Sequence, residues 1–267
     1  MAMLKQIIES KLRDIEDRQA RRPMEAIRAL AEMQARPQPV LNTVTGGQKV
    51  LIIGQVRQSL SDTGALTDAY DPVSLGLWLV QAGAEAIALF TDDIVYEHGL
   101  DDLTLLTRAI SVPGIVQDYV LNEYHLVEAR AAGASGLFLS TAVLPPKEVR
   151  NLISAATRNR MTAIVEVHNE EQLKVALAYS PHVIGIGNRD PENHTLDLEN
   201  VHRLRRFIPS HIRVMPTGAL QTWQDVAVVA NLRVDAVLVG KELISSPADG
   251  AKLRDALNRS NETMNSL

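Results

Sequence analysis

Short apolar runs alternate with amphipathic segments along the chain from residue 49 onwards. Several of these runs are apolar throughout, as expected for strands that helices cover on both faces. The segments between them repeat apolar residues at helical spacing. The alternation predicts parallel strands, each followed by a helix. Eight such runs are present, at residues 49–54, 84–90, 113–117, 134–140, 162–167, 182–187, 212–218 and 235–240.

Eight strand–helix units are the repeat of an α/β chain folded as a (β/α)8 TIM barrel. Gly83 and Gly133 follow predicted helices, where a C-terminal cap favours glycine. The alternative is a doubly wound open sheet. That fold usually has fewer parallel strands, and no GxGxxG motif follows the first run. We therefore expect a barrel over residues 49–267.

The first part of the chain has a different pattern. Its apolar residues predict an amphipathic helix over residues 4–35, with a possible break near Pro23. Residues 36–48 are rich in turn-forming residues and predict a linker. We expect residues 1–48 to form a helical extension and linker before the barrel.

Composition narrows the class of protein. Apolar residues make up 46% of the chain, which is enough for a large core. The net charge of −5 argues against a nucleic-acid partner, which would need a basic face. The one local basic cluster, at Arg203, Arg205 and Arg206, is interpreted as a solvated helix face.

The chain contains no cysteine, so disulfides and thiolate chemistry are excluded. No apolar run is long enough to span a membrane, and the N-terminal segment lacks the apolar core of a signal peptide. These features predict a cytoplasmic protein without a membrane partner.

A barrel of this kind carries its active site at the C-terminal ends of its strands. No histidines and carboxylates have zinc-binding spacing, so neither a metal nor another cofactor is expected. The polar residues at the predicted strand ends are Gln55, Arg57, Asp92, Gln117, Asp118, Ser140, Glu166, His168, Asn188, Arg189, Asp190, Thr217 and Lys241.

At this level of detail the chain resembles the indole-3-glycerol phosphate synthase family. The resemblance rests on residues 71–93, 112–134, 163–178, 183–200 and 235–243, and on the N-terminal helix over residues 7–23. It implies a (β/α)8 barrel preceded by an extra helix. It also implies a carboxy-lyase of the tryptophan pathway, which converts an anthranilate-derived ribulose phosphate into indole glycerol phosphate with loss of CO2 and water.

The resemblance also assigns the acid–base positions. The family's Glu-x-Lys on the first strand corresponds to Gln55 and Arg57, and its general-acid lysine on the third strand corresponds to Gln117. Its glutamate on the fifth strand is kept as Glu166. Glutamine cannot deliver a proton, and arginine is too weak an acid to do so. His168 or His98 is a candidate replacement acid.

The binding positions are better preserved. The family's Asn-x-Arg corresponds to Gly187-Asn188-Arg189, so its asparagine is either lost or displaced by one residue to Asn188. Its Glu-Ser-Gly corresponds to Pro216-Thr217-Gly218. The resemblance thus implies catalytic roles for Glu166, Arg57, Gln117 and Arg189, with Arg57 holding the substrate carboxylate. Glu166 could instead form a structural ion pair with Arg189. Asp92 and Asp118 are interpreted as residues that hold loops in place, in preference to a catalytic role. The substrate- and phosphate-binding set is Gln55, Thr217, Gly218, Gly240, Lys241 and Asn188.

Two functions follow from this pattern. The first is a diverged member of the family, monomeric or homodimeric, with weak or altered activity on a phosphorylated aromatic or amino-sugar ligand. The alternative is a catalytically silent barrel that binds a phosphorylated ligand as a regulator or partner subunit. Nothing in the sequence favours a third, purely structural role.

Overall fold

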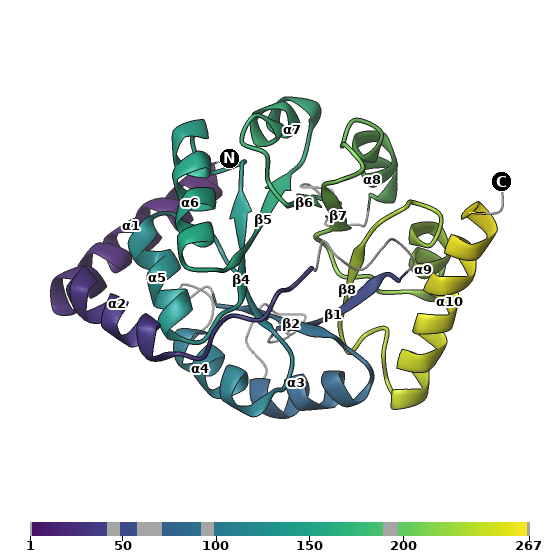
Figure 1. Cartoon of the computed structure of the whole chain (residues 1–267), viewed down its shortest axis with the longest axis horizontal. Helices are drawn as coiled ribbons and strands as arrows, with labels where there is room; N and C mark the ends of the chain where they lie inside the picture. The colour runs from purple at the N-terminus through teal and green to yellow at the C-terminus, as the bar shows by residue number, and fades with distance from the viewer. Residues whose placement is uncertain (1, 42–48, 58–70, 92–98, 189–196, 266–267) are drawn as a thin grey trace.

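The computed structural model describes residues 2–41, 49–57, 71–91, 99–188 and 197–265. Within these ranges, helices form a ring around eight strands (Figure 1). The strands are β1 (Leu51–Val56), β2 (Ala86–Phe90), β3 (Gly114–Gln117), β4 (Gly136–Ser140), β5 (Thr162–Val167), β6 (Val183–Ile186), β7 (Arg213–Pro216) and β8 (Ala236–Val239). The helices are α1 (Ala2–Arg21), α2 (Met24–Met33), α3 (Pro72–Gln81), α4 (Gly99–Ala109), α5 (Glu123–Ala131), α6 (Pro146–Arg158), α7 (Glu170–Leu177), α8 (Leu198–Arg205), α9 (Trp223–Val229) and α10 (Pro247–Asn265).

The strand order confirms the barrel. Each strand pairs in parallel with the next from β1 to β7, and β1 also pairs with β8. Between β7 and β8 the Asp235 N–H donates to the Val214 carbonyl at 2.7 Å, and Leu220 bridges to Val239. An open doubly wound sheet would leave its outer strands apart, so that alternative is wrong.

The strand bounds differ slightly from the apolar runs. β1 extends through Val56, so Gln55 lies inside the strand and not after it. Most other strands are shorter than their runs, because the flanking residues lie in turns. The two glycine caps are confirmed, with φ of 95° at Gly83 and 92° at Gly133.

The alternation of side chains along each strand separates two cores. Ile53, Ile115, Phe138 and Ile164 belong to a buried cluster inside the barrel, whereas the intervening residues pack under the helices. Because side chains two residues apart share a face, the inward positions beyond these four are Gln55, Gln117, Ser140 and Glu166. The same alternation that builds the core therefore delivers polar groups to one end of the barrel.

The segment predicted as a linker also contributes to the barrel. Val40 is only 3% exposed and belongs to the interior cluster. A Cβ added at Gly136, at the start of β4, would lie 3.0 Å from Val40 Cγ2. Before it, the Gln38 N–H donates to Ser135 Oγ. Val40 thus closes the N-terminal end of the barrel, while the domain boundary at residue 49 stays a prediction.

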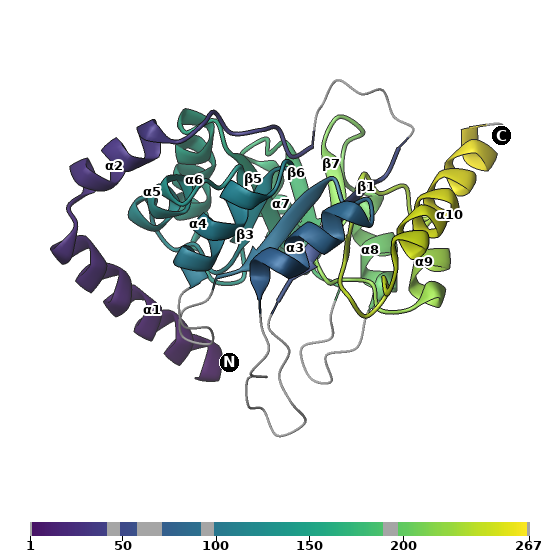
Figure 2. The same cartoon turned by 90° about the horizontal axis from the view of Figure 1, so that it is seen from below.

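The N-terminal region forms two helices and not one. The predicted break at Pro23 is confirmed, because Pro23 has an extended backbone and precedes α2. Both helices lie along one side of the barrel, with α2 against α5 (Figure 2). Ile15 of α1 and Ile27 of α2 are buried in the layer between barrel and helices. No helix in the described ranges is long and apolar enough to cross a membrane.

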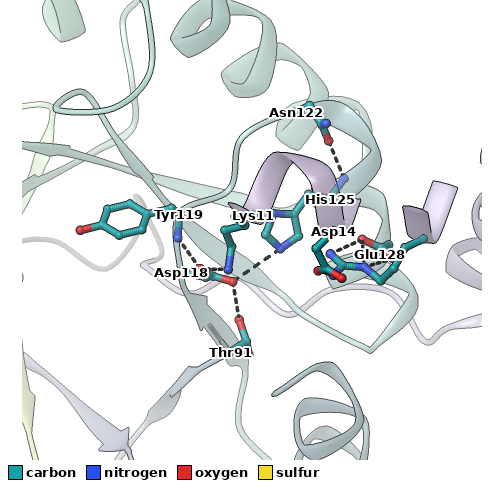
Figure 3. A network of polar contacts seen from close by, with 9 residues as sticks. Lys11, Asp14, Thr91, Asp118, Tyr119, Asn122, His125 and Glu128 are labelled. Carbon is teal, nitrogen blue, oxygen red and sulfur yellow. Dashed lines mark hydrogen bonds and ion pairs between the residues drawn. The ribbon is translucent and has the colours of Figure 1, made fainter. Parts of the chain in front are cut away.

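A buried ion pair holds α1 against the barrel. Lys11 Nζ lies 2.8 Å from Asp118 Oδ1, and the two side chains are 3% and 1% exposed (Figure 3). The Tyr119 N–H and the Thr91 hydroxyl also donate to this carboxylate. His125 Nε2 lies 3.6 Å from its Oδ2. Asp118 therefore faces the helix layer, as the loop-holding interpretation expects.

Candidate active site

A cavity of about 670 Å³ lies at the C-terminal end of the strands. The structure brings seven of the predicted site residues to its wall, although their roles in binding and catalysis remain predictions. Gly240 and Lys241 are not among the residues that line it, and Arg189 lies outside the described residues, as do Asp92, His98 and Asp190. The seven are Gln55, Arg57, Gln117, Glu166, Asn188, Thr217 and Gly218.

Glu166 lies at the centre of the polar wall. Its Oε1 accepts a hydrogen bond from Thr217 Oγ1 at 2.7 Å, and its Oε2 lies 3.6 Å from His168 Nε2. Ser140 is its register partner on β4 and also lines the cavity. Because Arg189 is not described, the suggested ion pair between Glu166 and Arg189 stays untested, and His168 is the cationic partner that the structure shows.

The pair favours its charged forms. Burial alone would raise the pKa of Glu166, but contact with His168 and the hydrogen bond from Thr217 outweigh it, so the pKa lies below the usual range. Contact with Glu166 raises the pKa of His168 against the opposing effect of burial. A carboxylate beside an imidazolium is a combination that can hold a proton and release it to a ligand.

Gly187 makes room for this pair. A Cβ at Gly187 would lie 2.0 Å from His168 Nδ1, so any larger residue would displace the ring. The family's asparagine at this position is therefore incompatible with the place that His168 occupies here. The Asn200 amide, on α8, donates to the carbonyls of His168 and Gly187 and fixes the backbone of both.

We expect Gly187→Ala to separate His168 from Glu166. The backbone of Gly187 is not left-handed, so the clash involves the ring alone. Without the carboxylate beside it, the pKa of His168 should fall back towards about 6.5. An NMR titration of the His168 ring protons measures the change. An unaltered pKa would contradict the interaction between ring and carboxylate.

Two glutamines occupy the positions of the family's glutamate and lysine. Gln55 Nε2 donates to Gln117 Oε1 at 2.9 Å, so the two amides face each other inside the cavity. Gln117 Nε2 also lies 3.5 Å from the Thr217 carbonyl. In this chain the two positions therefore carry a neutral, hydrogen-bonded pair of amides.

Asn188 positions the backbone of the strand-seven turn. Its Oδ1 accepts from the Gly218 N–H at 2.5 Å, and its side chain is 1% exposed. The Gly218 N–H is therefore already engaged. At the neighbouring corner, a Cβ at Gly240 would lie 2.3 Å from a carboxylate oxygen of Glu242. A carboxylate here works against phosphate binding at this corner.

Two arginines are among the described residues on the wall of the cavity, Arg57 and Arg203. Arg57 lies after β1 with its guanidinium 5.3 Å from the centre of the Phe90 ring. Arg203, on α8, donates to Asn200 Oδ1 at 2.8 Å. Two separated cations suit a ligand with two anionic groups.

The basic cluster was interpreted as a solvated helix face, and this is wrong for one of its members. Arg205 is half-buried and donates to the carbonyls of Arg233 and Ile208. Arg203 and Arg206 are both exposed, and Arg203 also lines the open cavity. The lining residues that the sequence did not suggest for this site are Leu4, Phe90, Tyr119, Ala142, Gln172, Asp197, Asn200 and Arg203.

The apolar part of the wall includes Leu4, Phe90 and Tyr119. Leu4 comes from α1, so the extension reaches the rim of the cavity. Two aromatic rings on the same wall as Arg57, one of them in contact with it, suit an aromatic carboxylate. No group of three or more metal-binding side chains occurs in the part of the chain that the structure describes.

Comparison with known proteins agrees with this geometry. The model of the family described as indole-3-glycerol phosphate synthase matches residues 4–256. An indole-3-glycerol phosphate synthase from Dehalococcoides mccartyi is 30% identical over 258 residues, 96% of this chain and 100% of the relative. One from Roseiflexus castenholzii is 31% identical over 261 residues, covering 95% and 97%. One from Campylobacter jejuni subsp. doylei is 28% identical over 257 residues, covering 96% and 100%.

A match of this extent includes the N-terminal helices, all eight strands and most of α10. The described lining of the cavity, including Glu166, Arg57 and Arg203, lies inside the matched region. The chain belongs to the indole-3-glycerol phosphate synthase family.

Proposed function

We propose that the protein is a lyase that closes the ring of an anthranilate-derived ribulose phosphate, or a close phosphorylated relative, with an altered acid–base pair. Family membership supports a lyase of this type. The observation that carries the proposal is the contact between Glu166 and His168 inside the cavity. It provides a proton donor where the family's lysine is absent.

The reaction needs protons at one oxygen atom. The aromatic carbon that bears the carboxylate attacks the ketone carbon, and the ketone oxygen takes a proton as the C–C bond forms. The carboxylate then leaves as CO2, and its electron pair restores the aromatic ring. A second proton converts the hydroxyl into water, and the methylene beside the nitrogen loses one proton. The balance is one proton taken up overall.

The side chains of the cavity match these needs. His168 donates the first proton to the ketone oxygen, takes up a proton from solvent and donates it as the hydroxyl leaves as water. Glu166 holds the imidazolium in place and accepts the methylene proton. Arg57 binds the carboxylate beside the ring of Phe90. Arg203 is placed to bind the second anionic group, the phosphate. Gln55 and Gln117 contribute hydrogen bonds but no protons.

The proposal predicts a pH dependence. Since contact with Glu166 raises the pKa of His168 above its ordinary 6.5, the donor is protonated below that raised pKa and lost above it. Turnover should therefore fall as the pH rises through the raised pKa. We expect His168→Gln to lower kcat by about 100-fold at neutral pH. In the same variant, the fall in turnover with rising pH should also disappear.

The measurement is the fluorescence of indole glycerol phosphate formed by the purified chain from the anthranilate-derived ribulose phosphate. Glu166→Gln serves as a control that turnover arises in this cavity. Turnover that His168→Gln leaves unaltered at every pH would contradict the role of His168. Absence of turnover in the unaltered chain would contradict the proposed lyase.

One observation favours the second candidate, a silent barrel. The hydrogen-bonded pair of Gln55 and Gln117 removes both titratable groups that the family has at these positions. A silent barrel would show no turnover, while a phosphorylated anthranilate analogue would still raise the Tm. If the analogue no longer raises the Tm of the Arg57→Gln variant, it binds in the cavity at the strand ends.

A further inference from the structure

A second cavity, of about 580 Å³, lies on the outside of the barrel. It is formed by α2 and the segment after it on one side and by α5 and α6 on the other, where α2 packs beside α5 (Figure 1). None of its lining residues lines the cavity at the strand ends. It is therefore a separate site that the proposed reaction does not use.

The lining of this cavity is strongly basic. Five arginines against two glutamates, Glu32 and Glu123, leave three positive charges, in a chain whose net charge is −5. Such a local excess is unfavourable unless an anion offsets it. The five arginines are Arg28, Arg36, Arg130, Arg158 and Arg160.

Arg130 is the buried member of the group. It is 6% exposed, and its Nη2 donates to the carbonyls of Gln34 and Ala35 at 3.2 and 2.7 Å. Its Nη1 has no hydrogen-bond partner among the described residues. Burial lowers the pKa of Arg130, and no carboxylate of the described residues offsets this effect. Carbonyl oxygens accept hydrogen bonds from a buried guanidinium but do not balance its charge. Its burial is therefore unfavourable for the free energy of folding.

The exposed arginines compete for one acid. Arg28 Nη2 and Arg158 Nη2 both bind the same oxygen of Glu123, at 3.2 and 3.1 Å. Each guanidinium has five N–H donors, so most of their donors remain available to a ligand. Together with Arg130, these side chains surround the cavity with planar, anion-binding groups.

We propose that this cavity binds a small polyanion with at least two anionic groups, such as a phosphorylated carboxylic acid or a bisphosphate. The volume of the cavity suits a small molecule. The net charge of −5 argues against a nucleic acid, which carries the same sign of charge. The bound anion would join α2 to α5 and α6 through charges that otherwise repel one another.

Calorimetric titration with pyrophosphate, at constant ionic strength, tests the proposal. The titration is made in Arg57→Gln/Arg203→Gln, which removes both described arginines of the other cavity. Pyrophosphate should bind at one site. Adding Arg158→Gln/Arg160→Asn should weaken the binding by about tenfold or more, equivalent to about 1.4 kcal/mol. Asparagine is chosen because Arg160 has a φ of 57°, which asparagine tolerates.

The matched control is Arg150→Gln, since Arg150 is an exposed residue of α6 that does not line the cavity. It should leave the affinity unaltered. Absence of pyrophosphate binding in the Arg57→Gln/Arg203→Gln background would overturn the proposal. So would an affinity that Arg158→Gln/Arg160→Asn does not weaken. Both altered arginines of that pair are exposed, so circular dichroism should show an unaltered fold.

Discussion

Replacing Lys11 by methionine is expected to destabilise the protein by about 3–5 kcal/mol, because it leaves the carboxylate of Asp118 buried without its ammonium partner. The two atoms lie 2.8 Å apart, and both side chains are almost fully buried. The loss should be largest at α1, which the pair holds against the barrel. Urea unfolding measures the global effect, and limited trypsin digestion measures release of α1.

The control removes both charges. Lys11→Met/Asp118→Asn should recover most of the lost stability, because neither half of the pair is then left buried alone. The coupling energy of this double-mutant cycle isolates the interaction. A urea midpoint for Lys11→Met equal to that of the unaltered chain would contradict the anchoring role of the pair.

Restoring the family's two titratable groups should have the largest effect on turnover. Gln55→Glu/Gln117→Lys is expected to raise the rate of indole glycerol phosphate formation by about 10²–10⁴-fold, the range for one positioned general acid. The two amides already face each other at 2.9 Å, so the new carboxylate and ammonium would meet without rearrangement. The glutamate would keep the lysine charged and oriented.

Gln117→Met is the matched control, since methionine has similar length but no proton to give. It should bring no gain. Gln117→Lys alone should gain less than the double variant, because its ammonium lacks the carboxylate that orients it. A folded double variant without any gain would mean that a step other than the lysine's proton transfer limits the rate.

Most of the fold could be predicted because its signal is local. The apolar runs set the strands, and the helical spacing between them set the connections. Pro23 fixed the break between α1 and α2, and Gly83 and Gly133 fixed two helix ends. The bounds of β1 were missed because Gln55 and Val56 continue the strand into the polar end of the barrel, where apolar patterning stops.

The inward-facing residues of the site could also be predicted, since barrel strands deliver alternate side chains to one end. Gln55, Gln117, Glu166 and Thr217 all follow that rule. The next residue along the chain faces the opposite side, as the alternation requires. Asp118 follows Gln117 directly and faces the helix layer, where it forms an ion pair with Lys11.

The missed residues depend on contacts between distant segments. Nothing near Arg203 in the sequence distinguishes it from Arg206. Both are exposed, yet only Arg203 is among the residues that line the cavity. Leu4 reaches the cavity only because α1 docks along the barrel. The sequence around Arg130 gives no sign that this helix arginine is buried. It is buried because α2 packs on α5.

The position of Val40 has a consequence for biosynthesis. Val40 is translated before every strand of the barrel, yet the surface that it covers includes Gly136 of β4. Val40 can therefore close the N-terminal end of the barrel only after several strand–helix units have left the ribosome. Until then the apolar segment around Val40 stays accessible to chaperones, which makes the beginning of the chain one of the last parts to reach its native place.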